Sequence, residues 1–168
     1  EVQKTMAKYT KRRDKRGYEW KSAYRAQLKR LLESQKMTEQ EAECIRIRDI
    51  RRFVESGLGQ RMKKAAMKKH LYREQPFVIQ RSASMLDDGW KNETVLVQGI
   101  IDAYFMEEEE IVLVDYKTDR VKRGQEQKLI DLYHVQLEDY ARALERMTGK
   151  KVKEKIIYSF TLQKEILL

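Results

Sequence analysis

The alternation of apolar and polar residues in the middle of the chain predicts a β-hairpin. Two runs rich in β-branched residues, at positions 95–105 and 111–114, flank a short polar tip at positions 106–110. Side chains alternate between the two faces of a strand, so each strand should present every second residue on one face. On the first strand these residues are Leu96, Gln98, Ile100, Asp102 and Tyr104, and on the second they are Ile111, Leu113, Asp115 and Lys117.

The position of the turn predicts that two carboxylates face each other across this hairpin. With the turn centred near Glu108, Asp102 lies opposite Asp115. Two facing carboxylates destabilise a sheet, and burial raises the pKa of such groups unless a cation lies between them. Mg²⁺ prefers oxygen ligands and retains waters for a substrate. Lys117, on the same face, would lie beside such a metal, where it could orient a water or offset charge on a phosphate.

The Asp/Glu-x-Lys triplet is a weak signal by itself, because about three are expected by chance at this composition. Three occur, but only Asp115-Tyr116-Lys117 ends a β-type run and has a partner carboxylate at the end of the preceding run. The alternative is a polar strand end, with a solvated Asp and Lys at the rim of the sheet.

The rest of the chain is predicted to contain helices, then strands and one long helix. Apolar residues at helical spacing, a capping box at Thr38 and Glu41, and a Ser-Gly-Leu-Gly break predict four N-terminal helices, at 20–32, 38–44, Ile47–Glu55 and 60–69, with the break at 56–59. A first strand at 71–84 leads to a turn at Asp87-Asp88-Gly89, and a helix over Glu126–Thr148 precedes strands at 152–161 and 165–168. This order predicts an α/β fold: a mixed sheet with flanking helices, preceded by a helical N-terminal arm. The arm, residues 1–70, and the core, residues 71–168, are expected to form one domain together.

The composition is typical of a soluble globular protein with a charged surface. Of the 168 residues, 41% are hydrophobic and 38% are charged. No apolar run is long enough for a transmembrane helix, and the first residues lack the apolar segment of a secretory signal. The single cysteine, Cys44, excludes an internal disulfide and fits a reducing cytoplasm.

The positive charge is concentrated near the N-terminus. Residues 1–36 hold twelve Lys or Arg and four acidic residues, and therefore carry eight of the nine net positive charges. Cationic side chains attract nucleic acid by releasing its counterions. The alternative is a solvated arm that keeps the protein in solution.

Three ordered motifs resemble those of the RecB-type nuclease family in the PD-(D/E)xK superfamily. They are Gly99-Ile100-Ile101-Asp102, Asp115-Tyr116-Lys117-Thr118-Asp119 and Gln136-Leu137-Glu138-Asp139-Tyr140. The resemblance covers roughly residues 20 to 168 and is strongest to the nuclease domain at the C-terminus of a bacterial helicase–nuclease large subunit. It implies a restriction-endonuclease-like core that hydrolyses phosphodiester bonds with Mg²⁺, for which Mn²⁺ can substitute.

The resemblance also implies a role for each motif residue. Asp102, Asp115 and the main-chain carbonyl of Tyr116 would bind the metal, and Lys117 would position the attacking water or stabilise negative charge. Three further residues would support substrate and water: Gln136 and Tyr140, which lie four apart on one helix, and Glu74. The implied substrate is single-stranded DNA, delivered by a helicase motor in the same full-length chain during double-strand-break repair and recombination. A second subunit would be the partner, and the compartment would be the bacterial cytoplasm, at the nucleoid.

The sequence departs from the family at one ligand and leaves other functions open. RecB-type nucleases usually add a metal-binding histidine on an N-terminal helix, whereas the two histidines here, His70 and His134, are not in that setting. A nuclease-like module that binds DNA or a partner without turnover is the main alternative. Metal-free glycoside hydrolysis would need a wider carboxylate pair and a sugar-lined cleft. The sequence has no GxxxxGK[ST] phosphate loop, so ATP hydrolysis is not expected from these residues.

Overall fold

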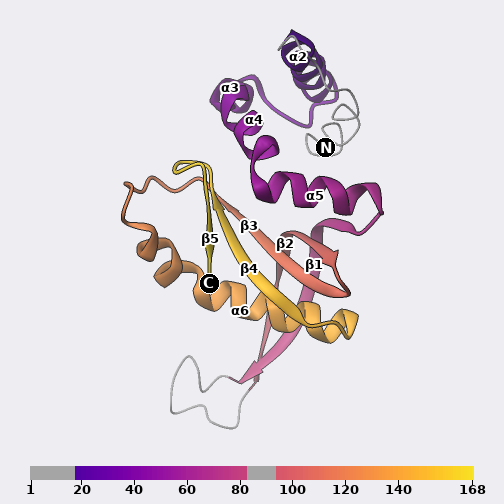
Figure 1. Cartoon of the computed structure of the whole chain (residues 1–168), viewed down its shortest axis with the longest axis vertical. Coiled ribbons are helices and arrows are strands. Elements are labelled where there is room, and N and C mark those ends of the chain that lie inside the picture. The colour runs from indigo at the N-terminus through magenta and orange to yellow at the C-terminus, as the bar shows by residue number, and fades with distance from the viewer. Residues whose placement is uncertain (1–17, 83–93) are drawn as a thin grey trace. The chain divides into compact units, whose positions relative to one another are not determined.

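The computed structural model describes residues 18–82 and 94–168, which divide into two units, one ending at Met67 and one beginning at Lys68 (Figure 1). Residues 1–17, which hold part of the basic arm, and the turn predicted at Asp87-Asp88-Gly89 lie outside the described residues. No described helix is both long and apolar enough to cross a membrane.

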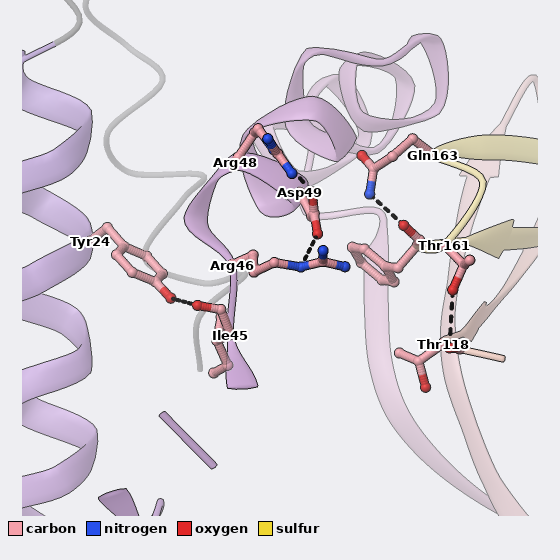
Figure 2. A network of polar contacts seen from close by, with 9 residues as sticks. Tyr24, Ile45, Arg46, Arg48, Asp49, Thr118, Thr161 and Gln163 are labelled. Carbon is pink, nitrogen blue, oxygen red and sulfur yellow. Dashed lines mark hydrogen bonds and ion pairs between the residues drawn. The ribbon is translucent and has the colours of Figure 1, made fainter. Parts of the chain in front are cut away.

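The first unit is helical in its described part. Its helices are α2 (Tyr18–Glu33), α3 (Glu39–Cys44), α4 (Ile47–Glu55) and α5 (Gly57–Met67). The predicted capping box is present, because Thr38 Oγ1 accepts from Glu41 N and the Glu41 carboxylate accepts from Thr38 N. Within this unit Arg46 Nε lies 2.8 Å from Asp49 Oδ2, at the start of α4 (Figure 2).

The break predicted at residues 56–59 is wrong in extent, since only Ser56 separates α4 from α5. The Ser56 hydroxyl donates to Phe53 O at 2.7 Å and accepts from Gly59 N at 3.1 Å, so one residue ends one helix and caps the next. A Cβ at Gly59 would overlap the Phe53 carbonyl. The second glycine therefore permits close packing of two helices rather than ending one.

The second unit is a five-stranded sheet crossed by one long helix. The elements are β1 (Leu71–Ser82), β2 (Thr94–Glu107), β3 (Glu110–Lys117), α6 (Glu126–Thr148), β4 (Val152–Ser159) and β5 (Lys164–Leu167). The strand order is β1-β2-β3-β4-β5, and only β3 and β4 are parallel, joined through α6. The predicted α/β class, with a mixed sheet and flanking helices, is confirmed.

The core of this unit lies between α6 and one face of the sheet (Figure 1). Leu129, Leu137 and Leu144 of α6 are at most 1% exposed, and they pack with Leu113 and Ile157 of the two parallel strands. Burying these side chains supplies most of the driving force that holds the helix on the sheet. The helix that follows β3 is thereby fixed over the strand that ends in Lys117.

The turns end the elements close to the predicted positions. Glu108 and Glu109, between β2 and β3, have φ angles of 54° and 66°, which is the conformation of a two-residue hairpin turn of type I′. Gly149 ends α6 with φ of 68°, a left-handed cap. The first predicted strand is two residues too long, since β1 ends at Ser82, and β4 likewise ends at Ser159.

Strict alternation of side chains does not continue through Asp102, so the predicted shared face of β2 is wrong in part. Leu96 and Ile100 are 71% and 59% exposed, whereas Tyr104 is 5% exposed and belongs to the same core as Ile101. The cause lies opposite Asp102 on β1, where Glu74 has φ of 50° and interrupts the ladder. A residue in this conformation turns the pleat locally and redirects the side chains on both sides of it.

Candidate functional site

The hairpin strands separate at the level of the two aspartates. The β2–β3 ladder ends at the pair Ala103 and Val114, after which β2 pairs only with β1 while β3 continues beside β4. The observed register places Asp102 opposite Asp115, one step beyond the last pair, as predicted. Here the Asp102 carboxylate replaces the missing ladder acceptor, since Tyr116 N donates to Asp102 Oδ2 at 2.9 Å. Both acids are therefore held where the sheet opens.

Asp115 is the more deeply buried of the two carboxylates. Its side chain is 3% exposed, and burial raises its pKa above the ordinary value. Lys117 opposes that rise, whereas the negative charges of Asp102 and Asp119 add to it. The charged form of Asp115 is thus held at a cost, as in sites that bind a cation.

The Lys117 ammonium joins this carboxylate to the long helix. Lys117 Nζ lies 2.7 Å from Asp115 Oδ2, although that oxygen has no well-directed hydrogen bond, so the contact is ionic. The ammonium also donates to Gln136 Oε1 at 3.2 Å, and Gln136 Nε2 donates to the Tyr140 hydroxyl at 2.5 Å. A continuous polar chain therefore runs from Asp115 to Tyr140, with its two helical members one turn apart.

Two residues not identified from the sequence also belong to this cluster. The Tyr133 ring lies under the ammonium, with its centroid 3.9 Å from Lys117 Nζ, and its hydroxyl donates to Asp119 Oδ1 at 2.9 Å. A signal was available, because Tyr133 precedes Gln136 by three residues and so shares its helix face.

Glu74 and the histidines lie apart from this cluster. Glu74 is exposed, at the register position opposite Asp102. His134 is exposed, and its ring contacts only the Asp131 carbonyl of its own helix among the contacts described. His70 is exposed just before β1. Neither histidine occupies the family's ligand position.

The residues present fit a hard divalent cation. Within 18–82 and 94–168 no three His, Cys, Asp or Glu side chains gather as metal ligands, which disfavours the three or four side-chain ligands of a zinc site. Two carboxylates and a neighbouring main-chain carbonyl are instead the sparse oxygen set with which Mg²⁺ is bound alongside water. The buried Asp115 Oδ2, which lacks a well-directed donor, offers a lone pair for such an ion.

Comparison with known proteins gives one family and a consistent set of relatives. The sequence model of the PD-(D/E)XK nuclease superfamily matches residues 2–166. Proteins named as subunits of an ATP-dependent helicase/nuclease are similar: 39% identity over 83% of this chain in Clostridium novyi (strain NT), 43% over 80% in Thermoanaerobacter sp. (strain X514) and 44% over 80% in Acetivibrio thermocellus (strain ATCC 27405). The match spans only 11–12% of the length of these relatives.

Proposed function

Because the chain belongs to the PD-(D/E)XK nuclease superfamily, we propose that it hydrolyses DNA phosphodiester bonds with a divalent metal ion. The observation that supports this proposal best is the position of Lys117, whose ammonium lies 2.7 Å from the buried carboxylate of Asp115 at the place where the sheet opens. An ion pair with no catalytic role would be an expensive use of a carboxylate whose burial raises its pKa.

The metal-binding residues in this proposal are Asp102, Asp115 and the main-chain carbonyl of Tyr116. Nucleases of this superfamily generally use divalent metal ions, and we propose Mg²⁺, with Mn²⁺ as a substitute, because the ligands are hard oxygens. When bound, such an ion polarises the phosphate and lowers the pKa of a water. The Asp102 carboxylate is already oriented by the Tyr116 N–H, so little reorganisation is needed.

Lys117 would hold the attacking water or stabilise the charge that develops on the phosphate. Its ammonium lies between Asp115 and Gln136, so it can reach the scissile group without leaving the carboxylate. Gln136 and Tyr140 would fix the ammonium and donate to phosphate oxygens from their remaining hydrogen atoms. Glu74 is proposed only as a further carboxylate near the site, since it faces Asp102 in the register.

We propose single-stranded DNA as the substrate, delivered by a helicase motor. The support is the name shared by the relatives, which describes them as parts of a helicase/nuclease, together with the 11–12% of their length that the match covers. Residues 1–70 and 71–168 would then act as one nuclease domain of a larger, AddA-like chain. That chain would pair with an AddB-like partner in double-strand-break repair and recombination, in the bacterial cytoplasm at the nucleoid.

A time course with labelled single-stranded DNA tests the proposal. We expect cleavage in Mg²⁺ that stops when EDTA is added, and we expect Asp115→Ala and Lys117→Ala each to lower the rate at least about a hundredfold, the usual effect of removing one electrostatic or acid–base group. Leu132→Ala, a change at an exposed site on α6, is the control. Salt-sensitive binding with no turnover, unchanged by either substitution, would instead favour a binding module.

A further inference from the structure

The Lys117 ammonium is confined by three neighbouring groups, two of them on α6. The Asp115 carboxylate lies at 2.7 Å, the Gln136 amide oxygen at 3.2 Å and the centroid of the Tyr133 ring at 3.9 Å. The lysine side chain is only 14% exposed, yet it still reaches solvent. A cation over the face of an aromatic ring is attracted by the ring's electron density. The third neighbour therefore supplies a favourable contact and not merely a steric wall.

The Tyr133 ring is itself held at both ends. Its Cβ is fixed by α6, and its hydroxyl donates to Asp119 Oδ1 at 2.9 Å. Burial and the Asp119 carboxylate raise the pKa of the phenol, which keeps the proton that this hydrogen bond requires. The ring cannot turn away from Lys117 without breaking the bond to Asp119.

Asp119 lies in a segment that is anchored to the turn after β4. Phe160 N donates to the Lys117 carbonyl at 2.9 Å, and Thr161 Oγ1 donates to the Thr118 carbonyl at 3.1 Å. Figure 2 shows the second of these bonds. The main chain from Lys117 to Thr118 is thus tied to the neighbouring strand connection, which limits where the carboxylate of the next residue can lie.

We propose that Tyr133 is a positioning residue of the nuclease, with Asp119 as its orienting partner. Its ring holds the ammonium of Lys117 beside the Asp102 and Asp115 carboxylates, so that a flexible four-carbon side chain presents its charge at one place. This inference rests on the proposed function and extends it, because neither residue is part of the metal-binding or phosphate-binding set proposed above.

Variants that separate the ring from the hydroxyl test the inference in the whole chain. Tyr133→Phe keeps the ring and should retain kcat within about threefold, whereas Tyr133→Leu should lower kcat about tenfold, with KM for single-stranded DNA changed less than about twofold. Asp119→Asn should resemble Tyr133→Phe, because an amide oxygen still accepts from the phenol. Leu132→Ala, an exposed site on the same helix turn, is the control and should leave kcat unchanged.

A second measurement reports the position of Lys117 without any reaction. Protons on the lysine Cε lie over the Tyr133 ring, so their NMR signals should be shifted upfield by the ring current. The shift should persist in Tyr133→Phe and disappear in Tyr133→Leu.

The outcomes distinguish this inference from the proposed function. Loss of activity in Lys117→Ala but full kcat in Tyr133→Leu, or an unshifted Lys117 signal in the unsubstituted chain, would overturn the positioning role alone. A larger rise in KM than fall in kcat would also overturn it, since that result indicates substrate binding. Equal activity of the unsubstituted chain and Lys117→Ala would overturn the nuclease proposal itself.

Discussion

At the scale of single residues, the buried carboxylate of Asp115 is the most costly feature of the site. Lys117 lies 2.7 Å away, yet the pKa of Asp115 is still raised, because burial outweighs the ion pair. A residue chosen for stability alone would be neutral at this position. The charged side chain therefore fits a site whose affinity for a cation is gained at the expense of folding stability.

Asp115→Asn should make the metal-free chain more stable than the unsubstituted chain at neutral pH. A carboxyl group whose pKa is higher in the folded state binds its proton more tightly there than in the unfolded chain, where the pKa is near 3.8. Its stabilising contribution is present below that value and is lost as the pH rises through the raised pKa. Each unit of the rise corresponds to about 1.4 kcal/mol.

Urea unfolding in EDTA at a series of pH values, from about 3 to about 7, measures this difference. The free energy of unfolding of the unsubstituted chain should fall relative to Asp115→Asn as the pH increases. Asp131→Asn, at an exposed aspartate of α6, controls for the lost charge. A gap that is constant with pH would mean that the Lys117 ion pair compensates burial fully.

At the scale of secondary-structure elements, the sequence predicts what local patterns determine. Alternation and turn length predict the register that places Asp102 opposite Asp115, and Gly149 predicts the end of α6. The positive φ of Glu74 could not be predicted, because no glycine or asparagine marks it. The Tyr133–Lys117 contact also depends on how α6 lies across the sheet, which no local pattern fixes.

The position of α6 depends on a buried ion pair with β1. Arg81 Nη1 lies 2.6 Å from Asp139 Oδ2, their side chains are 15% and 8% exposed, and Asp139 Oδ1 has no hydrogen-bond partner. Asp139 lies between Gln136 and Tyr140 along the helix, so the pair acts at the end of α6 that serves the site. Arg81→Met leaves a buried carboxylate without its partner and should cost about 3 kcal/mol of unfolding free energy.

Adding Asp139→Asn to Arg81→Met should recover part of this loss, because the unpaired charge is removed. Chemical denaturation of the two single variants and the double variant gives the coupling. Lys164→Met is the matched control, since its ion pair with Glu126 of the same helix is more exposed, at 58% and 25%, and should cost less than about 1 kcal/mol. Equal losses for the two lysine and arginine variants would mean that burial does not strengthen the β1–α6 pair.

At the scale of the whole molecule, charge and chemistry occupy different parts of the sequence. Residues 1–36 carry eight of the nine net positive charges, whereas the acidic pair and Lys117 lie in the second unit. A distribution of this kind fits substrate capture by counterion release at one part of the chain and hydrolysis at another. Capture and turnover should then be separable by substitution.

Replacing five basic residues with glutamine should weaken DNA binding and leave turnover of saturating substrate unchanged. The positions are Lys11, Arg12, Arg13, Lys15 and Arg16. Removing one cation that pairs with a phosphate of single-stranded DNA should reduce the slope of log affinity against log salt by about 0.7, measured by fluorescence anisotropy between about 50 and 200 mM salt. The matched control removes five exposed lysines from elsewhere in the chain: Lys64, Lys68, Lys69, Lys128 and Lys151. Equal slopes in the two variants would mean that the N-terminal charges act only through net charge, as a solvated arm does, because their position along the chain would then make no difference.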